Sequence, residues 1–247
     1  MGNILITGSS RGIGAATARV LAAKGHNLCI NYNQSQPAAD QLVKQVQQLG
    51  IKAIAVQADV SQEQQVMALF NAMDEQLGPL TGLVNNAGIL LPQMPVEQMD
   101  AARINRLLTT NVTSYFLCCK EAIKRMAIKH GGRGGAIVNV SSAAARLGAA
   151  GEYVDYAASK GAIDTLTRGL SVEVASQGIR VNCVRPGFID TKMHTDGGEP
   201  DRIERVKSAI PMGRGGTPEE VANAIAWLLS DEASYVTGSF TEIAGGR

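Results

Sequence analysis

The chain has 247 residues, with 23 lysines and arginines against 22 aspartates and glutamates. This length suits one α/β domain, and the balanced charge with no long basic run argues against nucleic acid as a partner. No apolar run could span a bilayer and no signal-peptide pattern opens the chain, so we expect no membrane association and a cytoplasmic location. The scattered cysteines and histidines lack metal-ligand spacing, which predicts reduced thiols and no metal site.

The chain opens with a predicted apolar strand at residues 3–7, followed by a glycine-rich loop and an amphipathic helix. This order is typical of a site for a phosphate-bearing cofactor. Glycines let the backbone approach a pyrophosphate, and the helix N-terminus offers free N–H groups and a favourable dipole. We therefore predict that a dinucleotide binds at Gly8, Ser10, Arg11, Gly12, Ile13 and Gly14.

The second predicted strand, residues 27–31, ends near Asn33 without an acidic residue. An NAD site usually has Asp or Glu there, where it binds the ribose 2′-hydroxyl. The missing acid and the presence of Arg11, whose guanidinium would attract a 2′-phosphate, favour NADP over NAD. The alternative interpretation is that Arg11 covers solvent-exposed surface, and use of NAD stays open.

Strands and helices alternate through the rest of the chain. Further strands are predicted at residues 52–57, 80–84, 136–140, 179–184 and 239–243. The spacing implies parallel strands joined by right-handed crossovers. We expect a single α/β domain over residues 1–247, a doubly wound Rossmann-type fold whose parallel sheet of about seven strands is flanked by helices.

Three local patterns add detail to this outline. Ser61 followed by Gln64 predicts a capping box at the start of one helix, and Thr217 with Glu220 predicts another. Residues 192–216 are irregular and rich in glycine and charge, which makes them a candidate substrate lid.

Catalytic chemistry is suggested by the strand at residues 136–140 and the helix after it. Ser142 follows the strand, while Tyr156 and Lys160 lie one turn apart on one face of the helix. A nearby ammonium favours phenolate and lowers the pKa of a phenol toward neutral pH. The three side chains would suit interconversion of a carbonyl and an alcohol, although a Tyr-Lys pair at this spacing also occurs by chance on helix surfaces.

Two further features concern asparagines. Asn86, Ala87 and Gly88 follow the strand at residues 80–84, where small residues let a flat cofactor lie close and asparagine amides can tie neighbouring strands together. Asn111 is a polar residue on the apolar face of a long helix. It is either a buried amide with satisfied hydrogen bonds or a functional group.

The motifs that match a known family are, in chain order, Thr7-Gly8-x-x-x-Gly12-x-Gly14, Asp59-Val60, Asn85-Asn86-Ala87-Gly88, Asn111, Ser142, Tyr156-x-x-x-Lys160 and Pro186-Gly187 followed by Thr191. With these motifs the chain resembles the short-chain dehydrogenase/reductase family over nearly its whole length. Within that family it looks like bacterial glucose-dehydrogenase-like and 3-oxoacyl-reductase-like members. The resemblance implies a homotetramer that acts on a small carbonyl or alcohol substrate, while the preference for NADP comes from Arg11 and the missing acid.

The resemblance also implies roles for the matching residues. Tyr156 would be the general acid/base, and Lys160 would lower its pKa and bind the nicotinamide ribose. Ser142 would orient the substrate oxygen, and Asn111 would hold a water that connects Lys160 to solvent. The implied cofactor contacts are Asp59 and Val60 at the adenine, Asn86, Ala87 and Gly88 at the adenosine ribose and phosphate, and Pro186, Gly187, Ile189 and Thr191 at the nicotinamide end.

Several alternatives stay open. Ser142 and Tyr156 are one residue further apart than is usual for the family, which leaves Ser141 as a weaker candidate. NADP-preferring relatives often carry Arg where Asn33 stands, so dual cofactor use is an alternative. Tyr153 lies near Tyr156, but only Tyr156 has a lysine four residues later.

The substrate and the reaction also have rival interpretations. The expected substrate pocket combines Leu90, Leu91, Met94, Arg146, Glu152, Tyr153 and His194, which suits a sugar, a polar ketone or an acyl thioester. The rival functions are a regulator that senses NADP without turnover, and a family-related lyase or epimerase.

Overall fold

The computed structural model describes residues 2–247, and its seven strands form one parallel sheet in the order β3-β2-β1-β4-β5-β6-β7. The strands are β1 (Asn3–Ile6), β2 (Asn27–Tyr32), β3 (Ala53–Gln57), β4 (Gly82–Asn85), β5 (Gly135–Val140), β6 (Ile179–Pro186) and β7 (Phe240–Ile243). The prediction of a doubly wound parallel sheet of about seven strands is confirmed.

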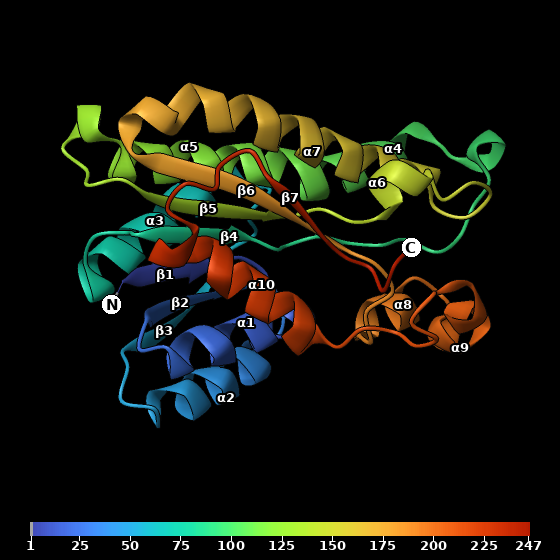
Figure 1. Cartoon of the computed structure of the whole chain (residues 1–247), viewed down its shortest axis with the longest axis horizontal. Coiled ribbons are helices and arrows are strands. Elements are labelled where there is room, and N and C mark those ends of the chain that lie inside the picture. The colour runs from blue at the N-terminus through green and yellow to red at the C-terminus, as the bar shows by residue number, and fades with distance from the viewer. Residues whose placement is uncertain (1) are drawn as a thin grey trace.

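Helices cover both faces of this sheet (Figure 1). One face carries α1 (Gly12–Ala23), α2 (Gln36–Gln47) and α10 (Pro218–Leu229). The other carries α3 (Glu63–Leu77), α4 (Ala101–Leu108), α5 (Ser114–Met126) and α7 (Val154–Val174). The short helices are α6 (Ala144–Leu147), α8 (Lys192–Asp196) and α9 (Arg202–Val206). None of the helices within residues 2–247 is long and apolar enough to cross a membrane.

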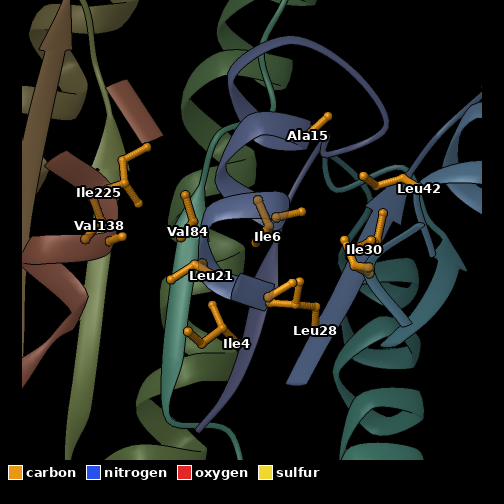
Figure 2. Packing of buried hydrophobic residues seen from close by; sticks show 14 of the residues in the cluster. Ile4, Ile6, Ala15, Leu21, Leu28, Ile30, Leu42, Val84, Val138 and Ile225 are labelled. Carbon is orange, nitrogen blue, oxygen red and sulfur yellow. The ribbon is translucent and has the colours of Figure 1, made fainter. Parts of the chain in front are cut away.

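The sheet divides the apolar core into two layers, because successive residues of a strand point to opposite faces. Ile4 and Ile6 belong to the layer beneath α1, α2 and α10, where they pack with Leu21 and Ile225 (Figure 2). Leu5, between them in sequence, belongs to the layer beneath α3, α5 and α7. Parallel strands buried on both faces read as continuous apolar runs, as these do.

One of the two predicted capping boxes is wrong. α3 begins at Glu63 and no side chain caps it; the Ser61 hydroxyl instead donates to Asp59 Oδ1 at 2.7 Å. Because Gln62 occupies the N-cap position, Ser61 lies one residue too early in the chain to cap the helix. The other box is confirmed, since Thr217 Oγ1 accepts from the Glu220 amide at 3.3 Å and the Glu220 carboxylate accepts from the Thr217 amide at 2.8 Å.

The connections that follow β1 and β4 run to opposite faces of the sheet, which creates a switch point at the carboxyl ends of these two strands. These strands are neighbours although β2 and β3 lie between them in sequence. The chain leaves β1 toward α1 on one face, and after β4 it continues to α4 and α5 on the other. Ligands of open α/β sheets bind outside the carboxyl ends of the strands at such a switch point. The chain after β6 enters α8 and α9, which stand at one end of the molecule in Figure 1.

We expect Leu83→Ala to lower the free energy of unfolding by about 2–5 kcal/mol, because Leu83 is fully buried in the central strand β4 and its loss leaves a cavity. The matched control is Leu49→Ala, whose side chain is 54% exposed and whose loss should cost less than about 0.5 kcal/mol. Urea unfolding followed by circular dichroism measures both. Equal losses in the two variants would contradict the two-layer core described above.

Candidate active site

A pocket of about 380 Å³ lies at the carboxyl ends of the strands. It is formed by segments far apart in sequence, from the glycine loop to the last residue. The residues predicted for catalysis or cofactor binding that line it are Ile13, Asn86, Gly88, Ser141, Ser142, Tyr156, Lys160, Pro186, Gly187, Ile189 and Thr191. The fold therefore brings the start of α1 and the segment after β6, both predicted to bind a nicotinamide cofactor, next to the residues predicted to perform catalysis.

The glycine loop leaves the start of α1 open to a ligand. Arg11, at the N-cap of α1, makes no side-chain hydrogen bond to the helix, so no N-cap side chain occupies its first N–H groups. Gly12 has a φ of +55°, a value that residues with a side chain rarely adopt. A Cβ placed on Gly14 would lie 2.7 Å from Asn86 Nδ2. The loop thus depends on glycine both for its turn and for its close approach to the loop after β4. Gly8, Ser10 and Arg11 complete the same loop.

Hydrogen bonds join the loops that follow β1 and β4. Asn86 Nδ2 donates to the Thr7 carbonyl at 2.9 Å and to the Gly8 carbonyl at 3.0 Å. The Ala87 amide donates to Thr7 Oγ1 at 3.0 Å. Asn31 Oδ1, at the end of β2, accepts from the Gly8 amide at 3.0 Å. The expectation that asparagine amides tie neighbouring strands together is confirmed.

The residues predicted for the adenine and the 2′-phosphate, namely Arg11, Asn33, Asp59 and Val60, lie beyond the lining of this pocket. Asn33 is exposed just after β2, and Val60 is buried after β3. Asp59 Oδ1 accepts from the Ser61 amide at 3.0 Å. Arg11, predicted to attract a 2′-phosphate, forms an ion pair of 2.7 Å with Asp196 of α8. The adenosine contacts of these residues stay predictions.

Lys160 occupies the base of the pocket, 3% exposed. Its Nζ donates to the Val140 carbonyl at 2.8 Å and to the Tyr115 hydroxyl at 3.4 Å. Tyr115, itself buried, donates to the same carbonyl at 2.9 Å. The amine also lies 5.7 Å from the centre of the Tyr156 ring. The sequence gave no sign that Tyr115 holds the lysine.

Burial changes the acid–base properties of both groups. It raises the pKa of Tyr156 to about 12, while the neighbouring Ser142 hydroxyl acts in the opposite direction. Burial also lowers the pKa of Lys160 to about 8. Burial is the larger influence on the Tyr156 pKa in this structure, and its lowering by Lys160 stays a prediction.

The two serines after β5 have different surroundings. The Ser141 hydroxyl is buried and donates to the Lys160 carbonyl at 3.1 Å, which fixes α7 to the end of β5. Ser142 lies beside the Tyr156 phenol, and its Oγ accepts from the Ala144 amide at 3.1 Å. Both serines line the pocket, and Ser142 is the one whose hydroxyl lies beside the Tyr156 phenol.

Asn111 lies in one turn of π-helix (Thr109–Thr113) between α4 and α5. Its Nδ2 donates to the Ile89 carbonyl at 3.0 Å and to Ser159 Oγ at 3.2 Å, and its Oδ1 accepts from the Ile89 amide at 2.8 Å. The side chain is thus a satisfied buried amide that fixes the loop after Gly88. A Cβ on Gly88 would lie 3.4 Å from Asn111 Oδ1 and 3.7 Å from Lys160 Nζ, so this loop passes directly over the amine.

The outer part of the pocket agrees only in part with the expected substrate-binding residues. Leu90, Glu152, Tyr153 and His194 line it, whereas Leu91, Met94 and Arg146 do not. Arg146 is turned away and pairs with Glu242 at 3.0 Å. That carboxylate belongs to β7, which is distant in sequence, so no local pattern could predict the pairing.

Arg202 is a pocket residue that the sequence did not indicate. It is 7% exposed and forms ion pairs with Glu152, at 2.6 Å, and with Glu199. Its guanidinium stacks 4.7 Å from the Tyr153 ring and 5.4 Å from the Phe188 ring. The Tyr153 hydroxyl in turn donates to the Gly197 carbonyl, so Tyr153 supports the segment after α8 and is turned away from proton transfer.

A sequence model of the family described as enoyl-(acyl carrier protein) reductase matches residues 8–247. The chain belongs to the short-chain dehydrogenase/reductase family and is an oxidoreductase of CH–OH and C=O groups. It is 66% identical to a protein of Escherichia coli (strain K12) named uncharacterized oxidoreductase YgfF, with 98% of each chain covered.

More distant relatives agree with this family. The chain is 37% identical to the 3-oxoacyl-acyl-carrier-protein reductase FabG of Staphylococcus aureus (strain Mu50), covering 98% of this chain and 96% of that one. The structure of a double mutant of a Serratia marcescens short-chain dehydrogenase/reductase superimposes with a TM-score of 0.90 at 33% identity, covering 99% of this chain and 97% of that one.

We expect Lys160→Met to raise the free energy of unfolding at pH 7, by on the order of 1–2 kcal/mol after the lost hydrogen bonds are deducted. The folded protein bears the cost of a buried charge below the Lys160 pKa of about 8. Between that value and the ordinary lysine pKa of 10.5 the folded protein sheds the proton while the unfolded chain keeps it, so wild-type stability rises with pH. Denaturant unfolding at pH 7 and pH 10 should show the advantage of the variant shrinking. An advantage that grows with pH would contradict this assignment.

Proposed function

We propose that the protein is an NADP-dependent oxidoreductase that interconverts a carbonyl and a secondary alcohol. The observation that carries the proposal is that Ser142 and Tyr156 line one pocket at the switch point of the sheet, with the Lys160 amine behind the phenol. Family membership supports the class of reaction. The choice of cofactor and the proton-transfer role of Tyr156 are the proposed parts.

The residues present fit a nicotinamide dinucleotide. The glycine loop and the uncapped start of α1 would hold the pyrophosphate. The other proposed contacts are Asp59 and Val60 at the adenine, Asn86, Ala87 and Gly88 in the middle, and Pro186, Gly187, Ile189 and Thr191 at the nicotinamide. When bound, the nicotinamide supplies hydride to the carbonyl carbon or accepts it in the reverse direction.

The preference for NADP rests on charge. Arg11 is 59% exposed at the glycine loop, so its guanidinium is accessible to a phosphate. Asn33 follows β2 where an NAD site would place an acid. Both features favour a 2′-phosphate, and Asn33 itself leaves room for some use of NAD.

Each catalytic residue has one proposed task. Tyr156 gives the proton of its phenol to the substrate oxygen in reduction and takes it back in oxidation. Ser142 donates a hydrogen bond to the same oxygen and so fixes the carbonyl in place. Lys160, whose pKa of about 8 lets it exchange a proton near neutral pH, supports the phenol electrostatically. Asn111 fixes the loop that lies over the amine, and its water-holding role stays a prediction.

Three wider expectations belong to the same proposal. Residues 192–216 form the substrate lid of a single catalytic domain. The homotetramer is carried over from the family resemblance, and the cytoplasmic location from the sequence. The physiological substrate is a small carbonyl or alcohol compound.

We expect Tyr156→Phe to lower kcat for carbonyl reduction by about 10²–10⁴-fold, because the phenol proton is lost while the ring remains. NADPH affinity should stay near wild type. Tyr153→Phe is the matched control, since its hydroxyl bonds to Gly197 and should affect kcat only a few-fold. Steady-state rates and NADPH fluorescence titration measure the two quantities. Equal losses in both variants would refute the assignment of Tyr156.

We expect Arg11→Gln to weaken NADPH binding by about 10–100-fold, the usual loss for a charge-assisted hydrogen bond, with NADH binding nearly unchanged. Fluorescence titration with both cofactors tests this. A similar loss for both would place Arg11 at a phosphate common to the two cofactors and remove the argument for NADP.

Two rival functions make different predictions. A regulator that senses NADP would bind the cofactor but change no NADPH absorbance with any aldehyde, ketone, sugar or acyl thioester. A lyase or epimerase would convert substrate without net consumption of cofactor. Product analysis with a full account of NADPH oxidised distinguishes both from a reductase.

A further inference from the structure

One ion pair connects the glycine loop to α8. Arg11 Nη2 lies 2.7 Å from Asp196 Oδ2, and the two side chains are 59% and 44% exposed. Arg11 is the residue that precedes α1, and Asp196 is the last residue of α8. Because both groups are in contact with solvent, the pair is weak and its guanidinium can exchange partners.

The same helix is packed against the cofactor site at both ends. Thr191, which precedes α8, lies against the glycine loop, since a Cβ on Gly12 would be 3.6 Å from Thr191 Cγ2. Gly197, which follows α8, lies against the pocket wall, since its Cβ would be 2.7 Å from Leu90 Cδ2. A ligand that enters between the glycine loop and α8 must therefore move or rearrange this helix.

The rest of the lid is fixed by separate contacts. Arg202 and Arg205 pair with Glu152 and Glu199, and none of these residues touches the glycine loop through an ion pair. Within residues 2–247, Asp196 is the single acidic partner of Arg11. Release of this one pair would remove the ion-pair contact between α8 and the glycine loop, while the ion pairs of α9 stay in place.

We propose that Asp196 is a specificity-determining residue that competes with the 2′-phosphate of the cofactor for Arg11. A phosphate offers the guanidinium more charge and more acceptor oxygens than a carboxylate does. When it takes Arg11, α8 loses its bond to the glycine loop and the pocket opens to substrate. NAD, without that phosphate, leaves the pair intact. The inference rests on the proposed function, because it requires Arg11 to bind the 2′-phosphate.

Binding of two nucleotide fragments tests the competition without turnover. Adenosine 2′,5′-bisphosphate carries the extra phosphate and adenosine 5′-monophosphate lacks it. With calorimetry at low ionic strength, Asp196→Asn should bind the bisphosphate about two- to five-fold more tightly, the range expected for a surface ion pair, and the monophosphate with unchanged affinity. Asp201→Asn, an exposed lid carboxylate without an ion pair in residues 2–247, is the charge-matched control and should change neither.

The same change in an Arg11→Gln background separates the two proposals. The gain from Asp196→Asn should vanish there, since no guanidinium remains to be contested. If the gain persists, or if both fragments gain equally, competition for Arg11 is overturned. If Arg11→Gln weakens the bisphosphate but Asp196→Asn changes nothing, the competition fails while the NADP proposal stands. If Arg11→Gln leaves bisphosphate affinity unchanged, the NADP proposal fails as well.

Hydrogen exchange of the α8 amides gives a second readout. In the wild type, adenosine 2′,5′-bisphosphate should speed their exchange and adenosine 5′-monophosphate should not. Asp196→Asn should show the faster exchange before any ligand is added. Exchange in α8 that is slowed by the bisphosphate, or is the same in the wild type and Asp196→Asn, would overturn the release of α8.

Discussion

The site depends on one buried amine and the carbonyl that receives it. Lys160 reaches back from α7 to the Val140 carbonyl, the last residue of β5, and Tyr115 of α5 donates to the same oxygen. One backbone group thus fixes the positions of two helices relative to one strand. A charge on so deeply buried an amine is costly, and the fold tolerates it because the amine donates to both the Val140 carbonyl and the Tyr115 hydroxyl. The phenol beside it is placed as a consequence of this arrangement.

Polar groups perform a similar task across the sheet. Asn31, Asn86 and Thr7 hold the ends of β2, β4 and β1 together through backbone groups. Deeper in the sheet, Asn85 donates to Asn139, which donates to Thr167 of α7. Buried polar side chains require hydrogen-bond partners, so each such contact fixes how the two segments that it joins are aligned. The apolar core supplies stability on both faces, and these amides specify how the loops at the pocket are arranged.

Much of the fold follows from local sequence. Apolar runs predicted the seven strands to within a few residues, and the spacing of Tyr156 and Lys160 predicted a shared helix face. Errors arose where a distant or competing partner decides the outcome. The Ser61 hydroxyl donates to Asp59 and does not cap the helix, and Arg202 forms an ion pair with Glu152 across the pocket. The Tyr156 pKa depends on burial, which no sequence pattern reports.

The π-helical turn at Thr109–Thr113 sets the rotation of the following helix, α5, about its own axis. Such a turn amounts to one extra residue within an α-helix, and each residue advances an α-helix by about 100°. Without the added residue, α5 would present a different stripe of side chains to the sheet. Tyr115 would no longer point at the end of β5, and the buried amine would lose a neighbour. A local irregularity in the chain therefore acts as the angular adjustment that aligns the following helix, α5, with the buried Lys160 amine.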